Sequence, residues 1–247
     1  MDSNLRANLA EFVGSFFFVF FTAGTVCALY LTGEPRLDVM GAALASGLTL
    51  AVVLTATSHV SPGCFNPAIT LTLWVYKRLD GRRMIMLVVM QLIGALLAGL
   101  VLRFSFGDDV LIPAHAGTPY LTGAFRVNGV IEVKSLLSGL GVEVILTCFL
   151  TLAVFATLFD PRAPKAGGFG VGLAQVAVVL FGFRLTGGSA NPARWFGTVV
   201  WELTLKVPRA GGESALSDHA VYWAGPVLGA LLGGLLYTAV FLPEKKQ

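Results

Sequence analysis

The sequence contains Thr186-Gly-Gly-Ser-Ala-Asn-Pro-Ala-Arg-Trp-Phe-Gly197, which places a proline and an arginine between long apolar segments. A near copy, Ser61-Pro-Gly-Cys-Phe-Asn-Pro-Ala-Ile-Thr70, occurs earlier in the chain. The triplet Asn-Pro-Ala is therefore present twice, at Asn66-Pro67-Ala68 and at Asn191-Pro192-Ala193. Each triplet follows a turn rich in Ser and Gly and precedes an apolar segment.

Each triplet is predicted to start a short helix. Asn is a favoured N-cap, and Pro suits the first helical position because its missing N–H would have no partner there. Helices from Asn66 to Tyr76 and from Asn191 to Trp201 would each be roughly 16 Å long, about half of a hydrocarbon core of about 30 Å. Irregular backbone at that depth is tolerated where it lines a watery cavity, and helix N-termini carry free N–H donors. The two copies therefore predict a polar pathway at the middle of a membrane.

The composition indicates a polytopic membrane protein. The chain has 247 residues, of which 55% are hydrophobic and 13% charged, and its mean hydropathy is +0.78. The predicted fold class is an all-α membrane protein, a single domain over 1–247 with six transmembrane helices and two re-entrant half-helices. The six apolar spans are predicted at about 8–31, 40–59, 83–104, 136–158, 167–185 and 220–242.

The order of the spans indicates an internal duplication. Repeat one covers about 1–104, a linking outer loop covers 105–135, and repeat two covers about 136–247. Three spans per repeat force the second repeat to enter the membrane upside down, an inverted arrangement known among transporters. The basic cluster from Lys77 to Arg83 flanks short connections, so both termini are predicted to be cytoplasmic, in a plasma or inner membrane.

Several functions are disfavoured by what the sequence lacks. The net charge is +3, and because the basic residues form no stripe, nucleic acid is not expected as a partner. The three cysteines have no spacing that indicates a zinc site or a disulfide framework. No nucleophile, base and orienting group can be assembled, so neither an enzyme nor a bound metal or cofactor is predicted.

Three charged residues inside apolar spans are candidate site residues. Glu11 and Glu143 occupy matching places in the two repeats; each either relays protons or, as we favour, accepts hydrogen bonds from the backbone of the adjacent re-entrant turn. Arg194 follows the second triplet where the first has Ile69, which indicates a site that needs a permanent cation. His59 precedes the first triplet and is interpreted either as a gate or as a loop-fixing hydrogen-bond partner.

Matching stretches along nearly the whole chain resemble one known family. They are Ala10-Glu-Phe-Val-Gly14, Ser58-His-Val-Ser-Pro-Gly-Cys-Phe-Asn-Pro-Ala-Ile-Thr70, Thr186 to Gly197 and Tyr222-Trp-Ala-Gly-Pro226. This combination resembles the aquaporin, or major intrinsic protein, family. The resemblance implies a passive channel in membrane lipid, with one pore per subunit and four subunits in a homotetramer.

The resemblance also implies which residues line the pore. Counting from the two triplets, the family's outer constriction falls at Ser46, Val179, Gly188 and Arg194. Strict water channels typically have an aromatic residue, a histidine, a small residue and the arginine at these places, so Ser46 and Val179 are expected to widen the aperture. Cys64 stands where many members have a pore-lining histidine and is expected to face the pore.

The function predicted from these residues is a passive channel for water and small uncharged solutes such as glycerol, urea and silicic or boric acid, with protons and ions excluded. The amides of Asn66 and Asn191 are expected to donate hydrogen bonds at the midplane. A strict water channel is a second hypothesis, because the pair Tyr222-Trp223 is similar to that of water channels. An ion-coupled secondary transporter that uses Glu11 and Glu143 is a third hypothesis, and a structural junction protein of the same fold is a fourth.

Overall fold

The computed structural model describes residues 2–31, 39–62, 64–125, 131–162, 166–209 and 212–242, which form helices and connecting turns with no strand among them. Five helical segments are long and apolar enough to cross a membrane. They are α1 (Ser3–Ala28), α2 (Val39–Thr57), α4 (Gly81–Ser105), α6 (Val133–Val154) with its π-helical continuation η3 (Phe155–Phe159), and α9 (His219–Leu236) with its π-helical continuation η5 (Tyr237–Phe241). The predicted all-α membrane fold is confirmed.

The fifth predicted span is shorter than expected. Residues 167–185 were expected to cross the membrane, but the helix there, α7 (Phe169–Gly182), has 14 residues, or about 21 Å at 1.5 Å per residue. The N–H groups of Leu185 and Thr186 both donate to the Gly182 carbonyl at 2.9 Å, and a Cβ on Gly182 would lie 2.7 Å from the Gly188 Cα. The chain therefore turns at Gly182 into the second re-entrant loop instead of extending the helix.

Both predicted half-helices are present and begin at the Asn-Pro-Ala triplets. They are α3 (Pro67–Val75) and α8 (Pro192–Thr204), with Asn66 and Asn191 as their N-caps. The second extends three residues beyond the predicted end at Trp201. The remaining short elements are α5 (Asp108–Leu111), η1 (His115–Gly117) and η2 (Gly123–Phe125).

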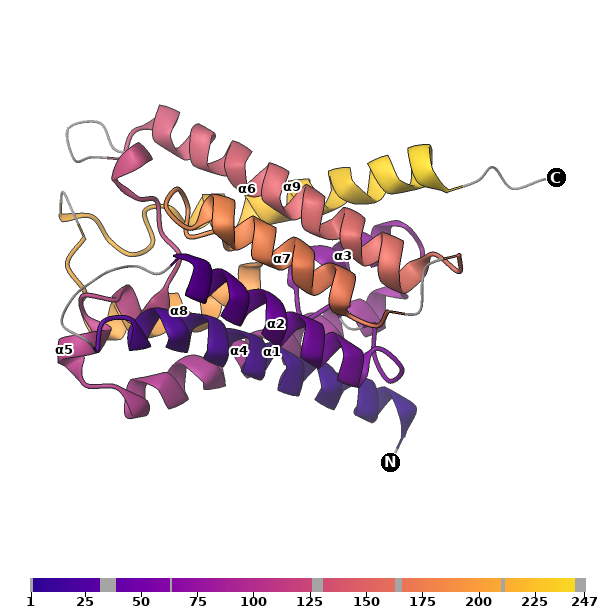
Figure 1. Ribbon diagram of the computed structural model, residues 1–247, viewed down its shortest axis with the longest axis horizontal. Helices are drawn as coiled ribbons and strands as arrows, with labels where there is room; N and C mark the ends of the chain where they lie inside the picture. The colour runs from indigo at the N-terminus through magenta and orange to yellow at the C-terminus, as the bar shows by residue number, and fades with distance from the viewer. Residues whose placement is uncertain are drawn as a thin grey trace.

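The long helices pack in pairs that are distant in sequence, α6 against α9, α1 against α4 and α2 against α7 (Figure 1). Glycine allows these close approaches. A Cβ on Gly172 of α7 would lie 2.5 Å from both the Gly47 carbonyl oxygen and the Ala51 Cβ of α2. Small residues at such crossings let helices in lipid gain van der Waals contact. Large apolar side chains such as Phe21 and Val52 point outward and are exposed, as a lipid-facing surface requires.

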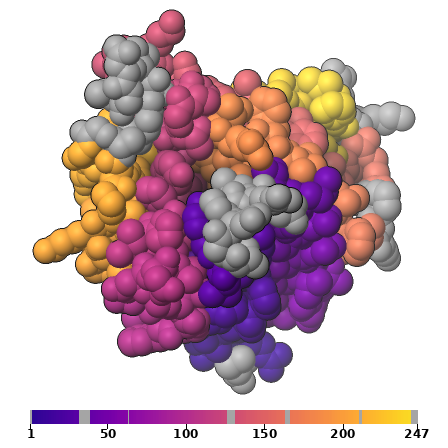
Figure 2. Space-filling view, turned by 60° about the vertical axis from the view of Figure 1, so that its left-hand side comes forward, coloured from indigo at the N-terminus to yellow at the C-terminus, as the bar shows by residue number. Residues whose placement is uncertain are grey.

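The two ends of the bundle differ. In Figure 1, α1 begins and η5 ends at the right-hand end, and the loop that holds α5, η1 and η2 lies at the opposite end. Figure 2 shows this loop end, where residues 105–120, in magenta, form part of the surface. Packing and hydrogen bonds order the loop: the Thr122 hydroxyl donates to the Arg184 carbonyl at 2.6 Å, and the Leu121 N–H donates to Asp218 at 3.0 Å.

Candidate functional site

The two half-helices begin with the same local geometry. The Asn66 side-chain oxygen accepts a hydrogen bond from the Ala68 N–H at 3.0 Å, and the Asn191 oxygen accepts one from the Ala193 N–H at 2.9 Å. Both asparagines have extended backbone and each is followed by proline at the first helical position. These are the N-caps that the sequence predicted, and they fix the oxygen end of each amide toward its own helix.

The nitrogen end of each asparagine amide reaches across to the other re-entrant loop. Asn66 Nδ2 donates to the Ala190 carbonyl at 2.7 Å, and Asn191 Nδ2 donates to the Phe65 carbonyl at 2.9 Å. Phe65 and Ala190 have φ of 43° and 47°, a left-handed conformation that turns the chain immediately before each cap. A side-chain amide has two N–H protons, so after this exchange each asparagine keeps one N–H for another partner.

Glu143 of α6 holds the second re-entrant loop. Its Oε1 accepts from the Thr186 hydroxyl at 2.6 Å and from the Ser189 N–H at 3.1 Å, and its Oε2 accepts from the Ala190 N–H at 2.7 Å. The carboxylate is fully buried. Buried charge is tolerated when its oxygens are satisfied, and here the loop supplies the donors.

Glu11 of α1 holds the first re-entrant loop in the same way. Its carboxylate accepts from the Ser61 hydroxyl, from the Cys64 N–H at 3.2 Å and from the Phe65 N–H at 2.9 Å. Gln91 of α4 adds a bond at 2.7 Å. Both glutamates therefore make the backbone hydrogen bonds expected of them.

A small cavity lies where the two asparagines meet, and we call it the asparagine cavity. Its volume is about 10 Å³, close to the least that holds one water molecule. The polar residues that line it are Asn66, Asn191, Cys64 and Gln175, and the rest of the lining is apolar. Cys64 is 4% exposed and contributes to this lining, and its exposure to the pore stays a prediction.

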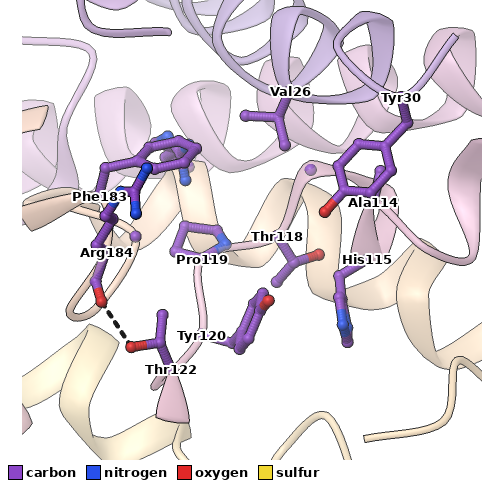
Figure 3. Close-up of a pocket in the computed structure, with 13 residues that line it drawn as sticks. Val26, Tyr30, Ala114, His115, Thr118, Pro119, Tyr120, Thr122, Phe183 and Arg184 are labelled. Atoms are coloured by element: carbon purple, nitrogen blue, oxygen red, sulfur yellow. Dashed lines mark hydrogen bonds between the residues drawn. The ribbon is translucent and has the colours of Figure 1, made fainter. Parts of the chain in front are cut away.

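A larger cavity of about 360 Å³ opens at the loop end, and we call it the mouth cavity. Figure 3 shows Tyr30 and His115 on one side of Thr118, with Phe183 and Arg184 on the other. Arg194 also lines this cavity.

Arg194 has free hydrogen-bonding groups although it is only 2% exposed. Its Nε and Nη1 atoms find no acceptor among the residues that the structure describes. The hydroxyl of Thr118 likewise has no hydrogen-bond partner among them. Buried polar groups normally have partners. Two unpaired polar side chains at one cavity indicate that its contents supply the partners.

The four constriction candidates do not all reach a cavity. Arg194 lines the mouth cavity, whereas Ser46, Val179 and Gly188 line neither of the two cavities. Gly188, at φ 57°, packs against α7, where a Cβ would lie 3.2 Å from the Val179 Cα. Ser46 is fully buried. His59 also reaches neither cavity and is exposed in the turn after α2.

The structure adds one residue to the pore candidates that sequence reasoning missed. Gln175 of α7 lines the asparagine cavity, and its Nε2 donates to the Ser46 hydroxyl oxygen at 3.0 Å. The signal was present in the sequence, because Gln175 is polar within the otherwise apolar run 169–183. Its pairing with Ser46 shows that the space beside this small residue is partly filled by an amide.

A buried ionic cluster holds the loop end together and was also missed. Arg209 donates to both carboxylate oxygens of Glu202 at 2.9 Å and to Asp218 at 3.0 Å. His115 contacts Glu202 at 3.0 Å, and the Arg209 guanidinium lies 5.5 Å from the centre of the Tyr120 ring. Burial raises the pKa of Asp218, while the charge of Arg209 opposes that shift. The cluster fixes the wall of the mouth cavity to the end of α8.

Comparison with known proteins agrees with this geometry. The sequence profile described as major intrinsic protein matches residues 1–237. The chain belongs to the major intrinsic protein family. Among similar aquaporins, TIP4-4 of Zea mays is 38% identical over 97% of this chain and 88% of its own length. Aquaporin Z of Photorhabdus laumondii is 32% identical over 98% of this chain and its full length.

A solved structure supports the same fold. The aquaglyceroporin from Plasmodium falciparum superimposes with a TM-score of 0.80 over 97% of this chain and 98% of its own, at 20% sequence identity. The resemblance found in the sequence is thereby confirmed. Because its relatives are channels, this member of the major intrinsic protein family is a multi-pass membrane channel of the aquaporin type and not an enzyme.

Proposed function

We propose that the protein is a passive channel for water and small uncharged solutes, including glycerol, urea and metalloid hydroxides such as silicic or boric acid. The observation that carries the proposal is Arg194, whose Nε and Nη1 are buried and unpaired among the described residues at the mouth cavity. Fixed N–H donors at a narrow point select solutes by their acceptors. The two asparagines, each with one remaining N–H, supply further donors beyond it.

The small residues predicted at the constriction support solutes larger than water. Ser46 and Val179 stand where strict water channels typically carry an aromatic residue and a histidine, and the mouth cavity of about 360 Å³ accommodates a polyol. Tyr222, which argued for a strict water channel, donates its hydroxyl to the Thr186 carbonyl at 2.8 Å and stacks on Trp195. Tyr222 therefore supports the re-entrant loop, and its presence is compatible with the wider range of solutes.

Exclusion of protons and cations is part of the proposal. The N-termini of α3 and α8 lie together at the asparagines, and each carries about half a positive charge. Arg194 adds a full charge. An ion-coupled transporter is disfavoured because both oxygens of Glu143 and of Glu11 accept hydrogen bonds from the re-entrant loops.

The experiment is stopped-flow light scattering on proteoliposomes, with empty liposomes as the control. Fast, non-saturating fluxes of water, glycerol, urea and silicic acid, without an ion requirement, are expected. Rapid water flux with rejection of all three solutes would establish a strict water channel instead. Proton flux is measured in parallel with a trapped pH dye, and proton conductance comparable to water flux would contradict the exclusion.

We also propose that the two halves are inverted repeats, that both termini are cytoplasmic, and that the protein forms a homotetramer in a plasma or inner membrane. The common end of α1 and η5 in Figure 1 supports a shared side for the termini, and exposed apolar side chains on α2 and α7 leave surface for neighbouring copies. Labelling of a cysteine introduced near each terminus in sealed cells tests the orientation. Native mass spectrometry of the detergent-solubilised protein tests the assembly.

A further inference from the structure

Gln175 has an unusual environment for a residue on a membrane helix. It is fully buried, it lines the asparagine cavity, and it lies one helical turn before Val179 on α7. Its Nε2 donates to Ser46 at 3.0 Å. Its Oε1 has no hydrogen-bond partner among the residues that the structure describes.

An unpaired buried carbonyl oxygen is unfavourable, because burial removes its hydrogen bonds to water and the protein replaces none of them. An apolar side chain at this position would avoid that penalty, and most of the asparagine cavity is lined by such side chains. The other polar groups around the cavity are the N–H groups of Asn66 and Asn191 and the thiol of Cys64. The molecule that passes through the cavity is therefore the natural partner for the free oxygen.

We propose that Gln175, held by Ser46, forms a hydrogen-bonding station for permeating solutes, at which its Oε1 accepts from a hydroxyl or amide N–H of the solute. Arg194 and the asparagines present donors, and Gln175 presents an acceptor. This order of donor and acceptor groups along the pathway suits solutes that carry donors and acceptors on neighbouring atoms, such as a vicinal diol or urea. The inference rests on the proposed function and adds to it a binding position beyond the outer constriction.

The test replaces Gln175 by two apolar side chains of similar size, in the variants Gln175→Leu and Gln175→Met, and compares them with Ser46→Ala in proteoliposomes. Loss of one hydrogen bond to the permeating solute predicts about tenfold lower permeability to glycerol and urea. Water permeability is expected to stay within about twofold. Ser46→Ala retains the carbonyl oxygen but removes the hydroxyl that holds Gln175, so it should lower solute permeability by less than either Gln175 variant.

Agreement between the two apolar variants identifies the hydrogen bond, and not the volume, as the cause. Unchanged solute permeability in both variants would overturn the proposal. So would an equal loss in Ser46→Ala, because Gln175 would then act only by positioning the serine. If water permeability, solute permeability and the thermal unfolding midpoint all fall in the two apolar variants, Gln175 has a structural role. That result would also overturn the proposal.

Failure of the proposed solute range gives a different result. If the wild-type protein passes water and rejects glycerol and urea, the breadth of the channel is refuted, and Gln175 is tested through water flux alone. A higher activation energy of water flux in both apolar variants then supports the station as a partner for water. An unchanged activation energy refutes the station.

Discussion

Replacement of Glu143 by Gln separates a structural carboxylate from one that carries protons. In the structure, three donors of the second re-entrant loop converge on this side chain: the Thr186 hydroxyl at 2.6 Å, the Ser189 N–H at 3.1 Å and the Ala190 N–H at 2.7 Å. A glutamine has one oxygen and one NH2 group. In Glu143→Gln at least one of the loop donors therefore faces another donor.

The magnitude follows from these bonds. A hydrogen bond to a charged group contributes about 1.5–3 kcal/mol, and the remaining bonds become weaker, neutral ones. Removal of a buried charge offsets part of this loss. We expect the free energy of unfolding to fall by about 2 kcal/mol, which for a protein of this size lowers the unfolding midpoint by about 4–8 °C.

The loss of these loop hydrogen bonds should also lower the water flux, because the Ala190 carbonyl of the same loop accepts the hydrogen bond from Asn66. Thermal unfolding in detergent and water flux in proteoliposomes measure the two effects. Glu11→Gln should behave like Glu143→Gln, and Asp109→Asn, at an exposed carboxylate of α5, serves as the control. Unchanged stability in Glu143→Gln, together with loss of an ion-dependent flux present in the wild type, would refute the structural interpretation.

The remaining predictions concern the cavities and the packing around them. Mercurials should react with the Cys64 thiol and thereby block water flux. If a mercurial still blocks flux in Cys64→Ser, the reactive thiol is another cysteine. Ser46→Phe combined with Val179→His should abolish glycerol and urea flux and retain water; retained solute flux would contradict the assigned constriction. Arg209→Ala leaves two buried carboxylates without their cation and should lower the free energy of unfolding by about 3–5 kcal/mol, measured by thermal unfolding. Gly172→Leu should lower the free energy of unfolding by about 1–3 kcal/mol or more, because it overpacks the contact between α2 and α7. A yield and an unfolding midpoint equal to those of the wild type would contradict this.

Much of the architecture followed from local sequence. Asn followed by Pro is sufficient to cap and start a helix, so the starts of α3 and α8 were predictable from three residues each. Hydropathy located the membrane spans because burial in lipid acts on each segment independently. The family resemblance and the partners of Glu11 and Glu143 followed from residues at matching places in the two halves.

Tertiary structure decided how the halves meet. The bond from Asn66 to the Ala190 carbonyl joins residues 124 positions apart, and that from Gln175 to Ser46 spans 129 positions. No local preference specifies such contacts, because they depend on how the helices cross. The early end of α7 depends likewise on contact between Gly182 and Gly188. Local sequence was enough to indicate the family and the two capped half-helices, whereas helix packing determines which polar atoms at the two cavities have no partner among the described residues.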